Sequence, residues 1–178
     1  VSIAYAFSKF IMGTLSDRSD ARKFLTAGLV IAALVMMSVG FLPFSASNMA
    51  INVAMLFVFM LFVGVLSGMG WPPCGRVMAY WFSNNERSFK MSLWNTSHTI
   101  GAGTLGIIAL FGVGIFADLG IEQTWRANFI FPSAVALVIA LFCWWALRDT
   151  PESCGLPSVA DWRNDHSGVK TKEKVGEK

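Results

Sequence analysis

The chain has 178 residues, of which 54% are hydrophobic and 14% are charged, and its mean hydropathy is +0.56. Because an average soluble domain carries about 25% charged residues, this composition excludes an ordinary soluble enzyme and indicates an integral membrane protein. The net charge of +3 reflects basic residues gathered in a few polar loops, so it gives no argument for a nucleic-acid partner.

The apolar stretches predict an all-α, polytopic bundle of membrane helices. The first stretch, at about residues 1–15, is shorter than the roughly 20 residues that a helix needs to cross a bilayer. The other four reach or exceed that length and lie at about 24–43, 49–75, 91–117 and 127–147. Since the chain opens in mid-helix without an initiator Met or a signal sequence, we expect a piece of a longer protein whose other helices are missing.

The basic residues predict which helix ends face the cytoplasm. Apart from Lys9, only Arg126 falls on the opposite side from the other Lys and Arg residues. The positive-inside rule makes the side of the majority cytoplasmic. We therefore expect residues 1–147 to form the transmembrane bundle and residues 148–178 to begin a cytoplasmic loop.

A kink or break is predicted in the third long stretch, where Gly68, Gly70 and Trp71 precede Pro72 and Pro73. Proline lacks a backbone donor and clashes with a preceding carbonyl, so the helix should kink or break near residue 72. At membrane depth, such a break is tolerated where protein or a cavity satisfies the freed carbonyls. A structural kink is the commoner explanation, and the wall of a cavity is compatible with it.

Two basic side chains, Lys9 and His98, lie inside apolar stretches at matching depth. Lys9 is eight residues before Asp17 and His98 is eight residues after Lys90. At helical rise each is about 12 Å from its polar turn, and half a hydrocarbon core is about 15 Å. Charged residues at this depth usually face a bundle interior or a wet cavity. The pair predicts an anion site, although a snorkelling lysine and a hydrogen-bonded core histidine explain each residue taken alone.

Each basic residue has a polar neighbour on its own helix face. Tyr5 is four residues from Lys9, and Asn95 is three residues from His98. A phosphate monoester, with about −1.5 to −2 charges at neutral pH, is an anion that lysine and a titratable histidine can attract. We expect Lys9 to supply fixed positive charge and His98 a switchable donor. Tyr5 and Asn95 are expected to orient the ligand through hydrogen bonds.

Motifs for cofactors, metals and hydrolysis are accidental or missing from the sequence. Gly101, Gly103 and Gly106 match G-x-G-x-x-G, but they lie in mid-span, whereas that fingerprint needs a strand before it and a helix beginning at it. Two histidines 68 residues apart and three scattered cysteines have no metal-ligand spacing. The acidic residues lie at loops or helix ends, so no carboxylate pair flanks a buried bond. We expect no metal, no cofactor and no enzymatic activity.

Several motifs resemble a family of transporters. The segment GTLSDRSDARK at residues 13–23 resembles the signature loop of the major facilitator superfamily. The superfamily's organophosphate:phosphate antiporters are similar at AYAFSKF (4–10), GMGWPPCGR (68–76), WNTSH (94–98) and RDTPESCGLP (148–157). The WPPCGR run favours the glycerol phosphate branch over the hexose phosphate relatives. The resemblance covers the chain up to about Asp165.

This resemblance implies a multi-pass protein of the bacterial inner membrane, in which the chain supplies helices two to six of an incomplete amino-terminal half. The residues that it places at the substrate pocket are Lys9, His98, Asn95, Tyr5 and Trp71. The implied activity is import of glycerol-3-phosphate in exchange for inorganic phosphate by alternating access. Alternatives are an antiporter for a hexose phosphate or phosphoglycerate and a sugar-phosphate sensor. The implied partners are these small anions, the lipid bilayer and the remaining helices of the full-length protein.

Overall fold

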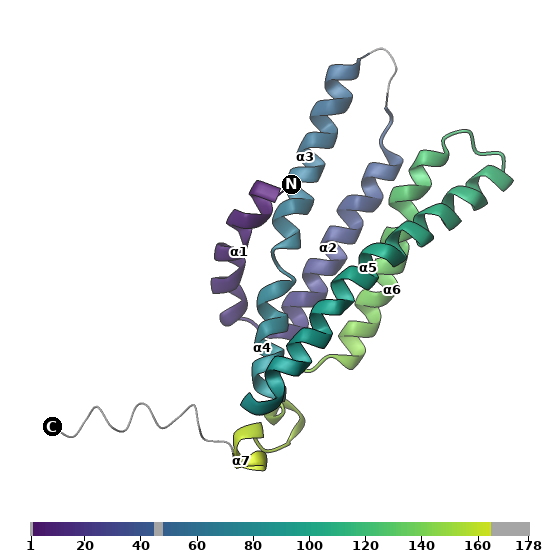
Figure 1. Cartoon of the computed structure of the whole chain (residues 1–178). Coiled ribbons are helices and arrows are strands. Elements are labelled where there is room, and N and C mark those ends of the chain that lie inside the picture. The colour runs from purple at the N-terminus through teal and green to yellow at the C-terminus, as the bar shows by residue number, and fades with distance from the viewer. Residues whose placement is uncertain (1, 45–47, 165–178) are drawn as a thin grey trace.

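The computed structural model describes residues 2–44 and 48–164, and within these ranges it contains helices and no strand. In chain order the elements are α1 (Ser2–Asp17), α2 (Ala21–Phe41), α3 (Met49–Ser67), α4 (Trp71–Trp81), α5 (Asn84–Asp118), η1 (Thr124–Arg126), α6 (Ala127–Ala146), η2 (Glu152–Cys154) and α7 (Val159–Arg163). Helices α1 to α6 form an elongated bundle, and α7 lies at one end of it (Figure 1). We call this end, which also carries the α1–α2 and α4–α5 turns, the charged end. The all-α prediction is confirmed.

Four helical segments are long and apolar enough to cross a membrane. They are Ala21–Phe41, Met49–Trp81, Asn84–Asp118 and Thr124–Ala146. These segments confirm the four long stretches predicted from hydropathy, and α1, with 16 residues, is the short one. The chain is therefore part of a multi-pass membrane protein.

Small side chains fill the contacts between helices, and bulky apolar side chains lie on the outside. The buried hydrophobic residues are mostly small: Ala21, Phe24, Ala33, Val39, Ala127 and Ala140. By contrast, Phe10 is 82% exposed and Leu141 is 72% exposed. This arrangement suits lipid, in which helices associate through close packing of small residues and bulky apolar groups lose nothing by facing outward.

The predicted polar turns are shorter than expected, because the helices extend into them. Of the predicted turn at 13–23, only Arg18 to Asp20 lies outside a helix. Asp20 caps α2, since its Oδ1 accepts a hydrogen bond of 3.2 Å from the backbone N–H of Lys23. The predicted cytoplasmic segment 148–178 is described as far as Asn164, and its remainder lies outside the described residues. The domain boundary after residue 147 stays a prediction.

The break predicted near residue 72 is confirmed and lies just before the two prolines, at Gly68–Gly70 between α3 and α4. Pro72 and Pro73 occupy the first turn of α4. Backbone N–H groups in a first turn have no helical acceptor, so proline costs nothing there. The prolines therefore begin a helix instead of distorting one.

Gly68 allows α1 to approach the end of α3 closely. A Cβ at this position would collide with Oγ of Ser8 and would lie 3.2 Å from the backbone nitrogen of Lys9. Gly68→Ala is therefore expected to displace α1 and to lower the free energy of unfolding by about 1–3 kcal/mol. Thermal unfolding of the purified full-length protein measures this loss. Gly13→Ala is the matched control, because a Cβ there would meet no atom within 4 Å. Equal losses in the two variants would contradict the prediction.

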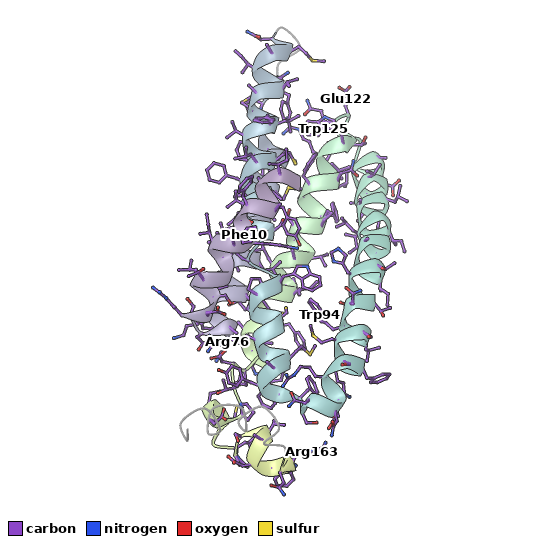
Figure 2. The ribbon with its side chains drawn as sticks, turned by 60° about the vertical axis from the view of Figure 1, so that its left-hand side comes forward. Phe10, Arg76, Trp94, Glu122, Trp125 and Arg163 are labelled. Carbon is purple, nitrogen blue, oxygen red and sulfur yellow. The ribbon has the colours of Figure 1, made fainter. Side chains whose placement is uncertain are left out.

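Arg76, on α4, joins four segments at the charged end (Figure 2). Its Nη2 forms a 3.0 Å ion pair with Oδ2 of Asp149, whose Oδ1 accepts a 3.0 Å hydrogen bond from the backbone N–H of Ala21. Its Nη1 donates to the carbonyl oxygens of Ser16 (3.1 Å), Asp17 (3.3 Å) and Ser19 (2.6 Å). One guanidinium thus donates to carbonyls at the end of α1 and in the turn that follows, where a helix offers no N–H donor. It also connects them to the segment after α6.

Candidate functional site

A cleft of about 450 Å³, open on one side, lies beside the break between α3 and α4. Its lining residues are Tyr5 from α1, Leu25 from α2, Ser67, Gly70, Trp71 and Cys74 around the break, and Trp94 and His98 from α5. Aromatic rings therefore form much of the wall, and a few polar groups converge among them. Concave sites of this make-up bind small molecules, with the polar groups fixing the orientation.

Lys9 places a cation at the edge of this cleft. Its Nζ lies 4.3 Å from the ring centroid of Tyr5 and 5.4 Å from that of Trp71, so both rings are within cation–π range. Neither ion pair found among the described residues involves Lys9. The preceding residue, Ser8, is buried against Gly68. This contact fixes the rotation of α1 that directs the ammonium toward the rings.

Two tryptophans connect α4 and α5 and so position the histidine. The ring centroids of Trp71 and Trp94 are 4.5 Å apart with an interplanar angle of 86°, an edge-to-face contact. His98 follows Trp94 by one helical turn and therefore lies on the same face of α5. Both residues line the cleft. The aromatic contact thus brings the imidazole to the cavity that Lys9 borders.

Four of the five predicted site residues come together here. Tyr5, Trp71 and His98 line the cleft, and the ammonium of Lys9 lies against two of its rings. Asn95 is exposed on α5 and is not among the lining residues. The face of α5 that meets the cleft runs through Trp94 and His98, and Asn95 is turned by about 100° from the former. The role of all five residues in substrate binding stays a prediction.

Sequence reasoning missed five of the eight lining residues: Leu25, Ser67, Gly70, Cys74 and Trp94. Trp94 precedes His98 by four residues, so the spacing that selected Asn95 could also have selected this ring. Ser67 and Cys74 flank the predicted helix break. A break that forms a cavity wall should present the residues on both of its sides, and this signal was available in the sequence.

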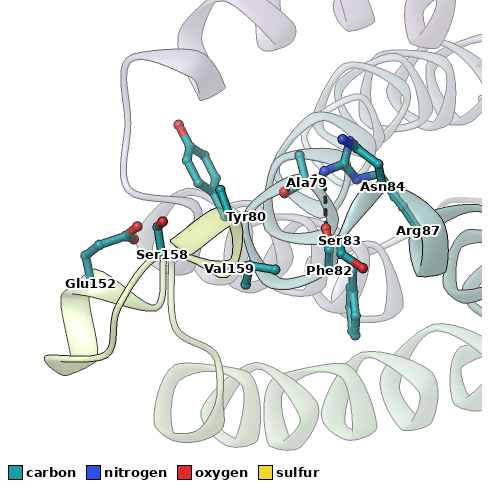
Figure 3. Close-up of a pocket in the computed structure, with 10 residues that line it drawn as sticks. Ala79, Tyr80, Phe82, Ser83, Asn84, Arg87, Glu152, Ser158 and Val159 are labelled. Carbon is teal, nitrogen blue, oxygen red and sulfur yellow. Dashed lines mark hydrogen bonds between the residues drawn. The ribbon is translucent and has the colours of Figure 1, made fainter. Parts of the chain in front are cut away.

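A second pocket, of about 380 Å³, lies at the charged end between the α4–α5 turn and α7 (Figure 3). Its arginine is already engaged, because Nη2 of Arg87 donates to the carbonyl oxygens of Ala79 (3.0 Å) and Phe82 (3.2 Å). The carboxylate of Glu152 also lines this pocket and disfavours an anion there. The central cleft, whose bordering ammonium forms no ion pair in the described part of the chain, is the better anion site.

Membrane transporters form their substrate sites beside discontinuous helices, and the cleft beside the break between α3 and α4 has this feature. The family model for the Major Facilitator Superfamily matches residues 1–170. The chain belongs to the Major Facilitator Superfamily. This result confirms the resemblance inferred from the sequence motifs.

Particular members of the superfamily are similar to nearly the whole chain. It is 46% identical over 166 residues to the glycerol-3-phosphate transporter of Bacillus subtilis, a match that covers 93% of this chain and 35% of the relative. It is 43% identical over 169 residues to the glycerol-3-phosphate transporter of Haemophilus influenzae, covering 92% and 34%. The Membrane sensor protein UhpC of Escherichia coli is 36% identical over 163 residues, covering 92% and 34%. The chain thus spans about a third of the length of these relatives. No solved structure matched it.

Proposed function

We propose that the full-length protein imports glycerol-3-phosphate across the bacterial inner membrane in exchange for inorganic phosphate. The observation that carries this proposal is the cleft in which the Lys9 ammonium lies against Tyr5 and Trp71 while His98 lines the same wall. Two of the similar proteins are named glycerol-3-phosphate transporters, which supports this choice of organophosphate.

The proposed recognition rests on charge. A cation at membrane depth is costly unless it faces a ligand or a wet cavity, and the phosphate dianion offsets that cost. Lys9 supplies the fixed charge, His98 donates a hydrogen bond that depends on its protonation, and the hydroxyl of Tyr5 orients the phosphate. Asn95, which does not line the cleft in this structure, is proposed to contact the ligand by a hydrogen bond. Inorganic phosphate offers the same charged group, so one site serves both ions in turn.

In this proposal, transport follows from alternating access. Two halves of the protein rock about a central site, as in transporters built from repeated halves. This chain supplies one wall of the site, and the remaining helices of the full-length protein supply the other. No chemical bond of the cargo breaks, so we propose that the protein is not an enzyme and requires no metal or cofactor.

Counterflow in vesicles that contain the full-length protein tests the proposal. Vesicles loaded with inorganic phosphate should take up external radiolabelled glycerol-3-phosphate, and chromatography should recover the label chemically intact. Omitting the internal phosphate should reduce uptake to the background level. Uptake that does not depend on internal phosphate would contradict exchange.

The same vesicles separate the other candidates. A membrane sensor, suggested by the similarity to UhpC, would bind the labelled organophosphate with little flux. An antiporter for another cargo would exchange labelled glucose 6-phosphate or 3-phosphoglycerate faster than glycerol-3-phosphate. Either result would replace the proposed cargo or activity.

A further inference from the structure

A groove between α2 and α6 lies apart from the cleft and takes no part in the proposed transport. Its volume is about 610 Å³, and its lining residues are Lys23, Thr26, Ala27, Val30, Ile31, Ala140, Leu141 and Trp144. Small residues from the two helices, Ala27 and Ala140, leave the space between them. Thr26 does not make the wall polar, because its hydroxyl donates to the carbonyl oxygen of Arg22 at 2.7 Å. The groove is therefore apolar except at its Lys23 end.

The Lys23 end carries uncompensated positive charge. Lys23 is exposed, and neither ion pair among the residues that the structure describes includes it. Of the nearby carboxylates, Asp149 pairs with Arg76, and Asp20 accepts from the backbone N–H of Lys23 without forming an ion pair with its ammonium. The adjacent basic residue, Arg22, adds a second cation at this end.

Arg22 is held beside the groove by a lining tryptophan. Its Nε donates to the carbonyl oxygen of Trp144 at 2.6 Å, and its guanidinium carbon lies 4.5 Å from the centroid of that ring. This contact caps one of the last carbonyls of α6. It also fixes a guanidinium, with further N–H groups beyond Nε, next to Lys23 at the level where tryptophan marks a membrane interface.

The length of the groove matches one leaflet. From Lys23 to Ile31, α2 rises by about 12 Å, and half a hydrocarbon core is about 15 Å thick. Its outer residues are ones that suit lipid, since Ile31 is 47% exposed and Leu141 is 72% exposed. The basic end of the groove lies where the phosphate headgroup of a lipid would lie. The apolar part of the groove is long enough for an acyl chain of one leaflet.

We propose that an anionic phospholipid of the leaflet at the charged end binds in this groove, with its phosphate at Lys23 and Arg22 and one acyl chain between α2 and α6. Basic pockets between membrane helices bind acidic headgroups through such contacts. The groove is a second anion site of the same chain, and its ligand remains in the bilayer.

Native mass spectrometry of the full-length protein in detergent, titrated with phosphatidylglycerol or with phosphatidylcholine of the same acyl chains, tests this proposal. The wild type should retain phosphatidylglycerol preferentially. Lys23→Gln should weaken retention of phosphatidylglycerol about fivefold, the effect of one basic residue near a membrane surface, and leave phosphatidylcholine unchanged. Ala27→Trp, which fills the groove, should reduce retention of both lipids. Lys90→Gln is the control, because Lys90 is a basic residue of the charged end outside the groove.

Three results would overturn the proposal. One is equal retention of the two lipids by the wild type, and another is unchanged phosphatidylglycerol retention in Lys23→Gln, a substitution at an exposed position that the fold tolerates. The third comes from a photoreactive diazirine residue in place of Leu141, which should form adducts with lipid. Cross-links from this position to a second copy or to another helix of the protein would show that protein covers the groove.

Discussion

Lys9→Ala is expected to reduce exchange of glycerol-3-phosphate for phosphate by about 100-fold or more, the effect of removing one partner of a hydrogen-bonded charge pair. Lys9 is exposed in this chain, and in the proposal the remaining helices of the full-length protein enclose it. The ammonium lies against the rings of Tyr5 and Trp71, and neither ion pair of the described ranges includes it. The phosphate of the cargo is therefore its proposed counterion. Alanine would leave that phosphate without its fixed positive partner at membrane depth. Initial rates of counterflow at equal protein density measure the loss.

Lys90→Ala is the matched control for this experiment. Lys90 also lies against an aromatic ring, with Nζ 5.6 Å from the centroid of Phe82, but it is in the first turns of α5 and does not line the cleft. Its removal should leave the exchange rate within about twofold of the wild type, because the half-buried Lys90 lies outside the cleft and does not contact the proposed cargo. Lys9→Arg should keep part of the activity by retaining the charge. Equal rates for Lys9→Ala and Lys90→Ala would remove Lys9 from the mechanism.

Arg76→Ala is expected to lower the free energy of unfolding by about 3 kcal/mol, at the low end of the loss when a buried pair is broken. The side chains of Arg76 and Asp149 are 21% and 16% exposed, so water compensates only partly for the lost contacts. The change leaves a carboxylate without its cation and removes one donor from each of three carbonyls, of which that of Ser16 still accepts from the backbone N–H of Ser19. Thermal unfolding of the purified full-length protein measures the effect.

Two further variants provide comparisons for the loss of stability in Arg76→Ala. The other ion pair of the described residues joins Arg163 to Glu86 at 2.8 Å, with side chains 56% and 36% exposed. Arg163→Ala should therefore cost less than about 1 kcal/mol. Asp149→Asn should have an intermediate effect, because the amide oxygen can still accept from the backbone N–H of Ala21 while the charge is lost. Equal losses in the free energy of unfolding for Arg76→Ala and Arg163→Ala would show that the contacts of Arg76 do not stabilise the fold more than an exposed ion pair does.

The spans and the spacing of residues along one helix could be predicted because both depend on local sequence, whereas the substrate site of Lys9 and His98 stays a prediction. A run of about 20 apolar residues is needed to cross a bilayer, and the four long stretches satisfy that requirement. The break was placed a few residues late, since Pro72 and Pro73 were expected to interrupt a helix and instead begin one. Helical spacing also placed Tyr5 beside Lys9, and the structure keeps these two residues in contact.

Contacts between distant segments could not be predicted in the same way. Arg76 and Asp149 were both present in motifs, but their pairing requires α4 and the end of α6 to meet at the charged end. Asn95 shows the same limit on a smaller scale. Its spacing correctly places it near His98 on α5, but the position of the neighbouring helices decides that Trp94 lines the cleft instead.

Arginine contacts to backbone oxygens hold both ends of the bundle. At the end opposite α7, Nη1 of Arg126 donates to the carbonyl oxygen of Gly40 at 2.9 Å, as Arg76 does to the carbonyls at the end of α1. A guanidinium stays protonated at all physiological pH values, and a peptide oxygen does not titrate. These arginine–carbonyl contacts therefore do not change near pH 6, where a phosphate monoester passes between its dianion and its monoanion. Acid sensitivity of the proposed transport would then report the ionisation of the cargo, and a proton gradient would act on the carried ion without breaking these contacts between the helices.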